Sequence, residues 1–194
     1  MRKRFCTILP LLLVFISSFN PSPPPQPKII LLPLGKVSDA FIKDAYERLR
    51  TFVPNVELRK AALMPPSAYY KPRNRYRADS LIAWMRNRAG ENETWLGITM
   101  NDISTTKGKH PDYGVMGLGY CPGKACVASS FRVRKKQYFF KVMVHELGHT
   151  TGLPHCKVRT CYMTDAEGGD PTERETGFCE RCSRHLKARG WKVK

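Results

Sequence analysis

The sequence predicts an α/β fold built on a mixed sheet. With 194 residues, the chain is long enough for one domain with a core and too short for two comfortable ones. Apolar, turn-bounded runs alternate with segments whose apolar residues recur at helical spacing, in the order strand, helix, strand, helix, strand. After Gly152 this pattern fades. We therefore expect a twisted sheet backed by helices, followed by a small irregular C-terminal subdomain.

The first 28 residues predict a targeting segment and a spacer. Residues 1–19 join the basic start MRKR to an apolar run of signal-peptide length, shorter than a membrane-spanning helix requires. The stretch NPSPPPQPK at 20–28 has a proline density typical of stiff, extended chain. We expect export to a secreted, periplasmic or lumenal compartment, or tethering by an uncleaved N-terminal anchor, in preference to the cytoplasm. A single domain would follow over 29–194, with subdomains 29–152 and 153–194.

The first elements of this domain follow from its apolar patterns. KIILLPLG at 28–35 is apolar and turn-bounded, which predicts a buried strand. Residues 38–53 begin with an N-cap serine and carry apolar residues at helical spacing, so they predict a helix. NVELRKAALM at 55–64 predicts a second strand. Residues 64–79 predict a loop that leads into the next helix.

The middle of the chain predicts a helix and three strands. DSLIAWMRNRA at 79–89 has the pattern of a helix, and TWLGITMNDIS at 94–104 that of a strand. DYGVMGLGY at 112–120 and ACVASSFRV at 125–133 predict two further strands, joined by the short turn CPGK.

The helix predicted over 135–152 carries the first metal-binding pattern. His145 and His149 lie four residues apart, so a helix directs both imidazoles from one face towards one point. Glu146 is adjacent to the first histidine, where its carboxylate can reach a water molecule without displacing a ligand. This HExxH arrangement predicts a zinc site with Glu146 as general base.

Gly152 and His155 extend this pattern to HExxHxxGxxH. Glycine tolerates the positive φ of a sharp exit from a helix, which would bring His155 back as a third ligand. Three neutral imidazoles leave zinc an open fourth position for water. The competing interpretation is that these histidines are buried or surface residues without a metal, and the complete motif argues against it.

The C-terminal cysteines predict a second metal site. They form a C-x4-C pair and a C-x2-C pair, separated by 17 residues, and a short helix is predicted near 180–189. Such spacing fits a tetrahedral all-thiolate zinc site, whose role would be structural because it has no open position. Two disulfides are the alternative, which the export signal favours. The four residues are Cys156, Cys161, Cys179 and Cys182.

Residues 145–182 resemble the archaemetzincin family of zinc metalloproteases, which belongs to the metzincin clan. The motif stands here as HELGHTTGLPHC, followed by the remaining cysteines and by Met163. The segments MPPSAYYKPRNRYRADSLI and TWLGITMNDIS also resemble family segments, so the resemblance covers most of 28–190.

The resemblance implies a zinc-dependent peptidase with a compact mixed sheet and an active-site helix beneath it. It implies one catalytic zinc on His145, His149 and His155, with Glu146 as base. It implies a second, structural zinc on the four cysteines, and Met163 as the methionine of the turn beneath the catalytic zinc. Peptides or proteins would be the substrates, and whether the enzyme cuts internally or trims ends is left open. We expect a monomer.

Cys121 and Cys126 lie outside these motifs. CPGKAC closes a tight turn between two predicted strands, and a disulfide there would fit an oxidising compartment. Two free thiols are the alternative.

The chain is strongly basic, with a formal net charge of +17. Clusters occur at 71–77, 132–136 and 184–194, and the interleaved Tyr76 and Trp191 could stack on bases. A zinc-stabilised module that binds nucleic acid or an acidic polymer is therefore the alternative function. A solvated basic face is the simpler interpretation, so we predict no specific nucleic acid and at most weak association with acidic polymers or anionic surfaces.

The stretch TDAEGGDPTERE at 164–175 concentrates acids in this basic chain. They predict a preference for basic side chains just after the cleaved bond, with a solvated acidic loop as the alternative. The five acids are Asp165, Glu167, Asp170, Glu173 and Glu175.

Overall fold

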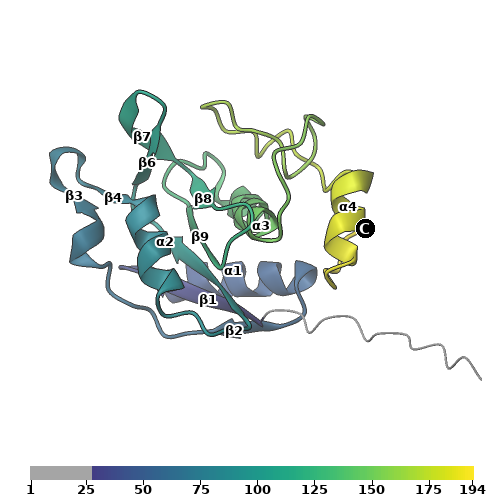
Figure 1. Ribbon diagram of the computed structural model, residues 1–194, viewed down its shortest axis with the longest axis horizontal. Coiled ribbons are helices and arrows are strands. Elements are labelled where there is room, and N and C mark those ends of the chain that lie inside the picture. Colours follow the sequence, from purple (N-terminus) through teal and green to yellow (C-terminus); the bar gives the residue numbers. More distant parts are fainter. Residues whose placement is uncertain (1–27) are drawn as a thin grey trace, which may run out of the picture.

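Residues 28–194 are described by the computed structural model, and they form two mixed sheets with helices packed on both faces of the larger one (Figure 1). The predicted leader and most of the predicted spacer lie outside the described residues. Among the described residues, no helix has the length and apolar character needed to cross a membrane.

The larger sheet has the strand order β2-β1-β5-β9-β8. Its strands are β1 (Lys28–Leu34), β2 (Val56–Leu58), β5 (Glu93–Thr99), β8 (Gly117–Gly119) and β9 (Ala125–Ser129). The first four strands in this order are parallel to one another, and β8 runs antiparallel to β9 at the edge. The prediction of a mixed sheet is confirmed.

Alternate residues of β1 explain why helices cover both faces of this sheet. Ile29 and Leu31 are buried in one core cluster together with residues of α1 (Asp39–Phe52) and α3 (Phe139–Thr150). Leu32 and Leu34 are buried in a second cluster with α2 (Ala78–Arg86). A strand that is apolar on both sides therefore separates two helical layers, as the continuous apolar run in the sequence indicated.

The two helix ends that the sequence marked are formed as predicted. Ser38 caps α1, because its hydroxyl oxygen accepts a hydrogen bond from the Phe41 N–H at 3.3 Å. Gly152 follows α3 with φ +95°, a conformation that glycine tolerates and other residues rarely adopt. The Leu153 N–H then reaches back to the Gly148 carbonyl at 3.2 Å, which turns the chain sharply after the helix.

A second sheet, which the sequence analysis missed, divides two of the predicted strands. It has the order β3-β4-β6-β7 and consists of β3 (Tyr69–Tyr70), β4 (Arg75–Arg77), β6 (Ile103–Lys107) and β7 (His110–Val115). The strand predicted at 94–104 in fact joins nearly all of β5 to the start of β6. The strand predicted at 112–120 is likewise split between β7 and β8, which belong to different sheets.

Other boundaries are shorter than predicted. The strand expected at 55–64 contracts to β2, and the strand expected at 125–133 ends with β9. A 3₁₀ turn at Lys136–Tyr138 precedes α3, so the helix begins at Phe139 and not at 135. The expected C-terminal helix is α4 (Glu180–Lys187), and the segment between α3 and α4 has only isolated bridges.

Candidate metal centres and the active-site cleft

Three histidines converge at the C-terminal half of α3. His145 and His149 project from the helix, and His155 comes from the segment that follows Gly152. The Nε2 atoms of His145 and His149 are 3.0 Å apart, and the candidate donor atoms of all three lie within 4.8 Å of one another. A tetrahedral zinc ion with Zn–N bonds of about 2.1 Å needs nitrogens about 3.4 Å apart, so the cluster fits zinc.

Main-chain carbonyls fix the orientation of the two helical histidines. Nδ1 of His145 lies 2.6 Å from the Tyr162 carbonyl oxygen, and Nδ1 of His149 lies 2.7 Å from the Leu153 carbonyl oxygen. A carbonyl only accepts, so each Nδ1 carries the proton and each Nε2 presents its lone pair to the cluster. This is the tautomer that binds a metal through Nε2.

A carboxylate orients the third histidine. Nδ1 of His155 lies 3.3 Å from an Asp165 carboxylate oxygen, which leaves Nε2 as the donor for a metal. The sequence analysis named Asp165 only as one acid of a loop and missed this contact. The available signal was an acid two residues after Met163, which is too common a feature to assign a partner.

Burial keeps the helical histidines neutral. It lowers the pKa of His145 to about 3, and the neighbouring His149 adds to this effect. Burial also lowers the pKa of His149. Neutral imidazole is the form that ligates a metal, so both residues are ready to bind at neutral pH.

Met163 lies directly against the active-site helix. It is fully buried, and a Cβ atom added at Gly148 would come within 2.5 Å of the Met163 sulfur. Gly148 stands immediately before His149, so this sulfur packs against the backbone that carries the ligands. This contact is the one that the expected role of Met163 requires, and the role itself stays a prediction.

Glu146 faces the edge strand β8. Its side chain is buried yet lines the cleft, and burial raises its pKa to about 8. A cation held by the adjacent histidines would oppose this rise. Gly117 and Gly119 pair with the β9 residues that face α3, so both lie over the helix. The sequence analysis did not identify these two glycines as part of the site. Alternate glycines in a strand nevertheless indicate that another segment, here α3, packs closely against its backbone.

Alanine at position 117 should lower any activity that depends on Glu146, because it displaces the carboxylate. An added Cβ would lie 2.5 Å from both Cγ and Oε1 of Glu146, so the carboxylate must move. We expect kcat/KM to fall about tenfold or more, because small misplacements of a reacting group are costly. Gly177→Ala is the matched control, since its added Cβ meets no atom within 4 Å. Equal activity of the two variants, with equal zinc content, would contradict this geometry.

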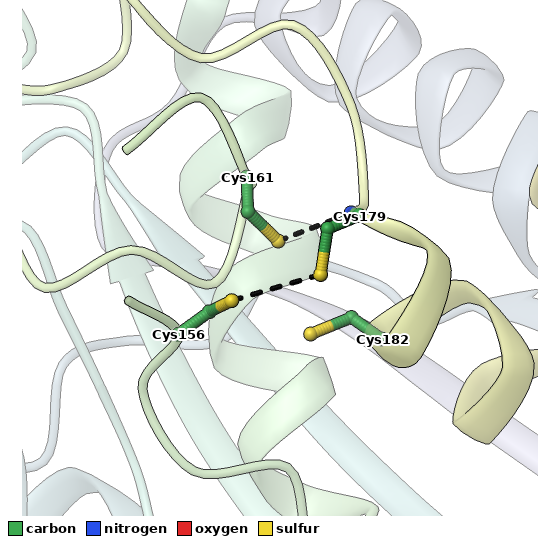
Figure 2. Close-up of side chains that lie close together, drawn as sticks. All are labelled: Cys156, Cys161, Cys179 and Cys182. Atoms are coloured by element: carbon green, nitrogen blue, oxygen red, sulfur yellow. Dashed lines mark hydrogen bonds between the residues drawn. The ribbon is translucent and has the colours of Figure 1, made fainter. Parts of the chain in front are cut away.

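The four C-terminal cysteines form a second cluster (Figure 2). Their sulfur atoms lie within 4.8 Å of one another, and the sulfurs of Cys156 and Cys179 are 3.6 Å apart. Zn–S bonds of about 2.3 Å place tetrahedral thiolates about 3.8 Å apart, whereas a disulfide needs about 2.05 Å. The N–H groups of Cys179 and Met163 point to the Cys161 sulfur at 3.3 and 3.4 Å, as suits a thiolate. The donor set fits zinc better than two disulfides.

Cys121 and Cys126 do not form the expected disulfide. Both are free thiols, Cys121 exposed and Cys126 buried. Cys126 lies on β9 in the core cluster beneath α1 and α3, whereas Cys121 lies past the end of β8 at the cleft. The structure therefore agrees with the alternative interpretation, in which both cysteines are free thiols.

The cleft that contains the histidine cluster has a volume of about 810 Å³. It is bordered by β8, by α3 and by the loop that follows Met163. His145, Glu146, His149 and His155 all line it. Because β8 is the edge strand of the larger sheet, the free side of its backbone lies beside the histidine cluster.

Several residues of the basic clusters are engaged within the fold. Arg75 is buried and pairs with Asp102 at 3.1 Å, and Arg132 holds the same carboxylate with two hydrogen bonds of 2.7 and 2.9 Å. Trp191 is buried against the ring of Phe178. The ring of Tyr76 packs 5.3 Å from that of Tyr69. These contacts favour structural roles over base stacking.

Known proteins resemble this chain over most of its length. The profile of Peptidase family M54 matches residues 39–188. The archaemetzincin of Methanopyrus kandleri is 32% identical over 162 residues, which cover 79% of this chain and 87% of that protein. Its crystal structure has a TM-score of 0.69 at 28% identity and covers 84% of this chain and 94% of that one. An Archaeoglobus fulgidus archaemetzincin structure shares the fold, with a TM-score of 0.67 at 24% identity, covering 81% and 99%.

Proposed function

This chain belongs to peptidase family M54, the archaemetzincins, and is a zinc metallopeptidase, and from that premise we propose that Glu146 is its general base. The observation that supports this role is the position of Glu146 beside three convergent histidines, in one cleft, under an edge strand. His145, His149 and His155 would hold the catalytic zinc. When bound, zinc supplies a positive charge that activates water and polarises the scissile carbonyl.

The chain's own residues then position the substrate and move a proton. A peptide pairs with the exposed edge of β8 as an added strand, so that its scissile bond lies over α3. Glu146 accepts a proton from the attacking water and delivers it to the leaving amine. We choose β8 for this pairing, because it is an edge strand whose glycines Gly117 and Gly119 lie against α3 beside Glu146 and His149.

The four cysteines would hold a second, structural zinc. They are contributed by the irregular segment after α3 and by the start of α4, so a metal there cross-links parts of the chain that have little regular structure of their own. Each chain would thus bind two zinc ions, and metal analysis of the purified protein measures this directly.

Digestion of a peptide library, read by mass spectrometry, tests the catalytic function. The intact chain should release fragments that Glu146→Gln does not release. The positions of the cuts also distinguish internal cleavage from trimming of chain ends. If both proteins gave identical fragment patterns, the cleavage would come from a contaminant and the proposed function would be wrong.

Export is a separate proposal and has its own test. Residues 1–28 fused to a reporter should carry it out of the cytoplasm, because the segment joins a basic start to an apolar run. Activity of the reporter should appear in the exported or membrane fraction. The control is the same fusion with Leu11, Leu12 and Leu13 changed to aspartate, which destroys the apolar run. A reporter retained in the cytoplasm by both fusions would reverse the assignment.

A further inference from the structure

The cleft extends past the histidine cluster, towards the N-terminal half of α3. Its lining there includes Lys141 and Val142, which precede His145 by about one turn, and the far end of the loop 164–175. Antiparallel pairing is the more stable mode of strand addition. Gly119 approaches His149 while Gly117 approaches Glu146, so β8 runs in the same sense as α3. A substrate antiparallel to β8 therefore places the residues after its cleaved bond at this end.

Two of the five acids in the loop 164–175 are engaged by other groups. Asp165 holds His155 and also accepts the Glu167 N–H at 2.9 Å. Asp170 accepts the N–H groups of Arg134 and Thr172, at 2.8 and 3.0 Å. Both carboxylates therefore have structural partners.

Two further acids do not face this end of the cleft. Glu173 pairs with Lys135 at 2.7 Å, and both side chains are about half exposed. Glu167 lines a separate, smaller depression on the other side of His155. Neither is placed to meet a substrate side chain in the cleft.

Glu175 remains, and its carboxylate has no partner among the described residues. It is 5% exposed and lines the cleft, and no hydrogen bond or ion pair to its carboxylate is formed. Lys141 is close, but its ammonium donates to the carbonyl oxygens of Thr172 and Glu175 at 2.6 Å each and lies 4.2 Å from the Tyr138 ring. The nearby cation is thus used by the main chain and forms no ion pair with the Glu175 carboxylate.

A buried carboxylate without a partner is unfavourable when charged. The Glu175 oxygens keep some contact with the cleft, and a cation that enters there would offset the hydration that burial removes. Resting on the proposed peptidase function, we propose that Glu175 is a specificity-determining residue that selects substrates with lysine or arginine immediately after the cleaved bond. The substrate's ammonium or guanidinium group supplies the partner that the fold leaves out.

The preference should depend on pH in a defined direction. Burial raises the pKa of Glu175 to about 7, so the carboxylate is charged above that pH and neutral below it. The groups that face it are Lys141, Tyr162, Asp170 and Arg174. Burial raises the pKa of Tyr162, and hydrogen bonds from Arg134 and Thr172 outweigh burial and lower that of Asp170, so neither titrates near pH 7. The preference for lysine should therefore strengthen from pH 6 to pH 8.

Peptides that differ at one position test this assignment. They carry lysine, norleucine or glutamate immediately after the cleaved bond, and a fourth peptide carries its lysine just before that bond. Norleucine retains the lysine stem without its charge. The full-length chain should cleave the lysine peptide about tenfold or more faster than the norleucine peptide, in kcat/KM. The fourth peptide should gain nothing.

The matched variants are Glu175→Gln and Glu173→Gln, which remove one acid each from the same loop. Glu175→Gln should reduce the lysine-to-norleucine ratio in kcat/KM to about 1, whereas Glu173→Gln should keep the ratio of the parent protein. A wild-type ratio near 1, or a ratio that survives Glu175→Gln, would overturn the assignment. Faster cleavage of the glutamate peptide would also overturn the assignment of Glu175, and it would indicate that Arg134, which lines the cleft, binds the substrate's side chain.

Binding measurements separate this proposal from the proposed function. Absence of cleavage of every peptide would contradict the peptidase function, and the pocket is then tested with the Glu146→Gln protein by fluorescence anisotropy. Tighter binding of the lysine peptide by about tenfold, lost on adding Glu175→Gln, supports the assignment of the pocket. Equal binding of the lysine and norleucine peptides overturns it.

Discussion

Glu146→Gln should slow peptide hydrolysis by about 10²–10⁴-fold, the usual contribution of a general base. Glutamine has the same shape but cannot accept the proton of the attacking water. Zinc content should not change, because the donor atoms that converge in the cleft come from the three histidines and not from Glu146. The measurement is turnover of a cleaved peptide, together with zinc content by atomic emission, on both proteins.

The stability of this variant has a predictable sign. Burial raises the pKa of Glu146 to about 8, above its ordinary value of 4.5, so in the metal-free protein the folded state binds the proton more tightly than the unfolded state. That contribution to stability is present at low pH and is lost as the pH rises towards 8. Metal-free Glu146→Gln should therefore melt no lower than the metal-free parent at pH 8. A variant with low activity that also lost its fold or its zinc would contradict a purely catalytic role.

Cys179→Ser should unfold the C-terminal region and also remove the catalytic zinc, although Cys179 is not a ligand of that ion. His155 and Cys156 are adjacent, and one faces the histidine cluster while the other joins the cysteine cluster. The Cys156 N–H bonds the Met163 carbonyl at 2.7 Å, so this short segment connects both clusters to the turn beneath α3.

The expected size of this effect is large. A structural zinc can contribute about 10 kcal/mol or more in small domains, comparable to the total stability of a domain, about 5–15 kcal/mol. Zinc stoichiometry, thermal melting and peptide turnover should all fall together in Cys179→Ser. The control is Cys121→Ser, an exposed cysteine outside the cluster, which should change none of them. One tightly bound zinc and near-normal activity in Cys179→Ser would show that the two sites are independent.

Elements with a strong local pattern were predictable from the sequence. The positions of β1, α1 and α3 were predicted correctly, apart from the start of α3, because the apolar pattern of each lies within one segment. Ser38 and Gly152 mark helix ends, the first through its hydroxyl group and the second through its positive φ. The two clusters of candidate metal ligands were predictable for a similar reason, since ligand spacing along one segment fixes much of the geometry.

The second sheet was not predictable, because long-range polar contacts create it. The apparent strand 94–104 breaks where the Ser129 hydroxyl donates to the Asn101 carbonyl at 2.6 Å, a contact across 28 residues. The apparent strand 112–120 breaks at Met116, whose carbonyl accepts the Ser129 N–H at 2.6 Å. At Met116 the apolar pattern continues although the backbone leaves one sheet for the other. At the first break the polar pair Asn101 and Asp102 interrupts the pattern, a signal that the sequence analysis passed over.

Partners of the site residues were equally hidden. The role of Asp165 depends on the ring orientation of His155, and the isolation of Glu175 depends on Lys141 donating to main-chain carbonyls. The disulfide expected between Cys121 and Cys126 is not formed, because Cys126 is buried in the core whereas Cys121 is exposed. Each of these outcomes is decided by side-chain direction, which local sequence spacing does not encode.

The carbonyl contacts to His145 and His149 also determine how the site responds to mutation. Any residue substituted at Leu153 or Tyr162 still presents a carbonyl oxygen, so the tautomers of these two histidines are insulated from point changes at the positions that set them. The third histidine has no such protection, because its partner is the side chain of Asp165. A single substitution at position 165 can therefore change the orientation of His155 while all three histidines are retained.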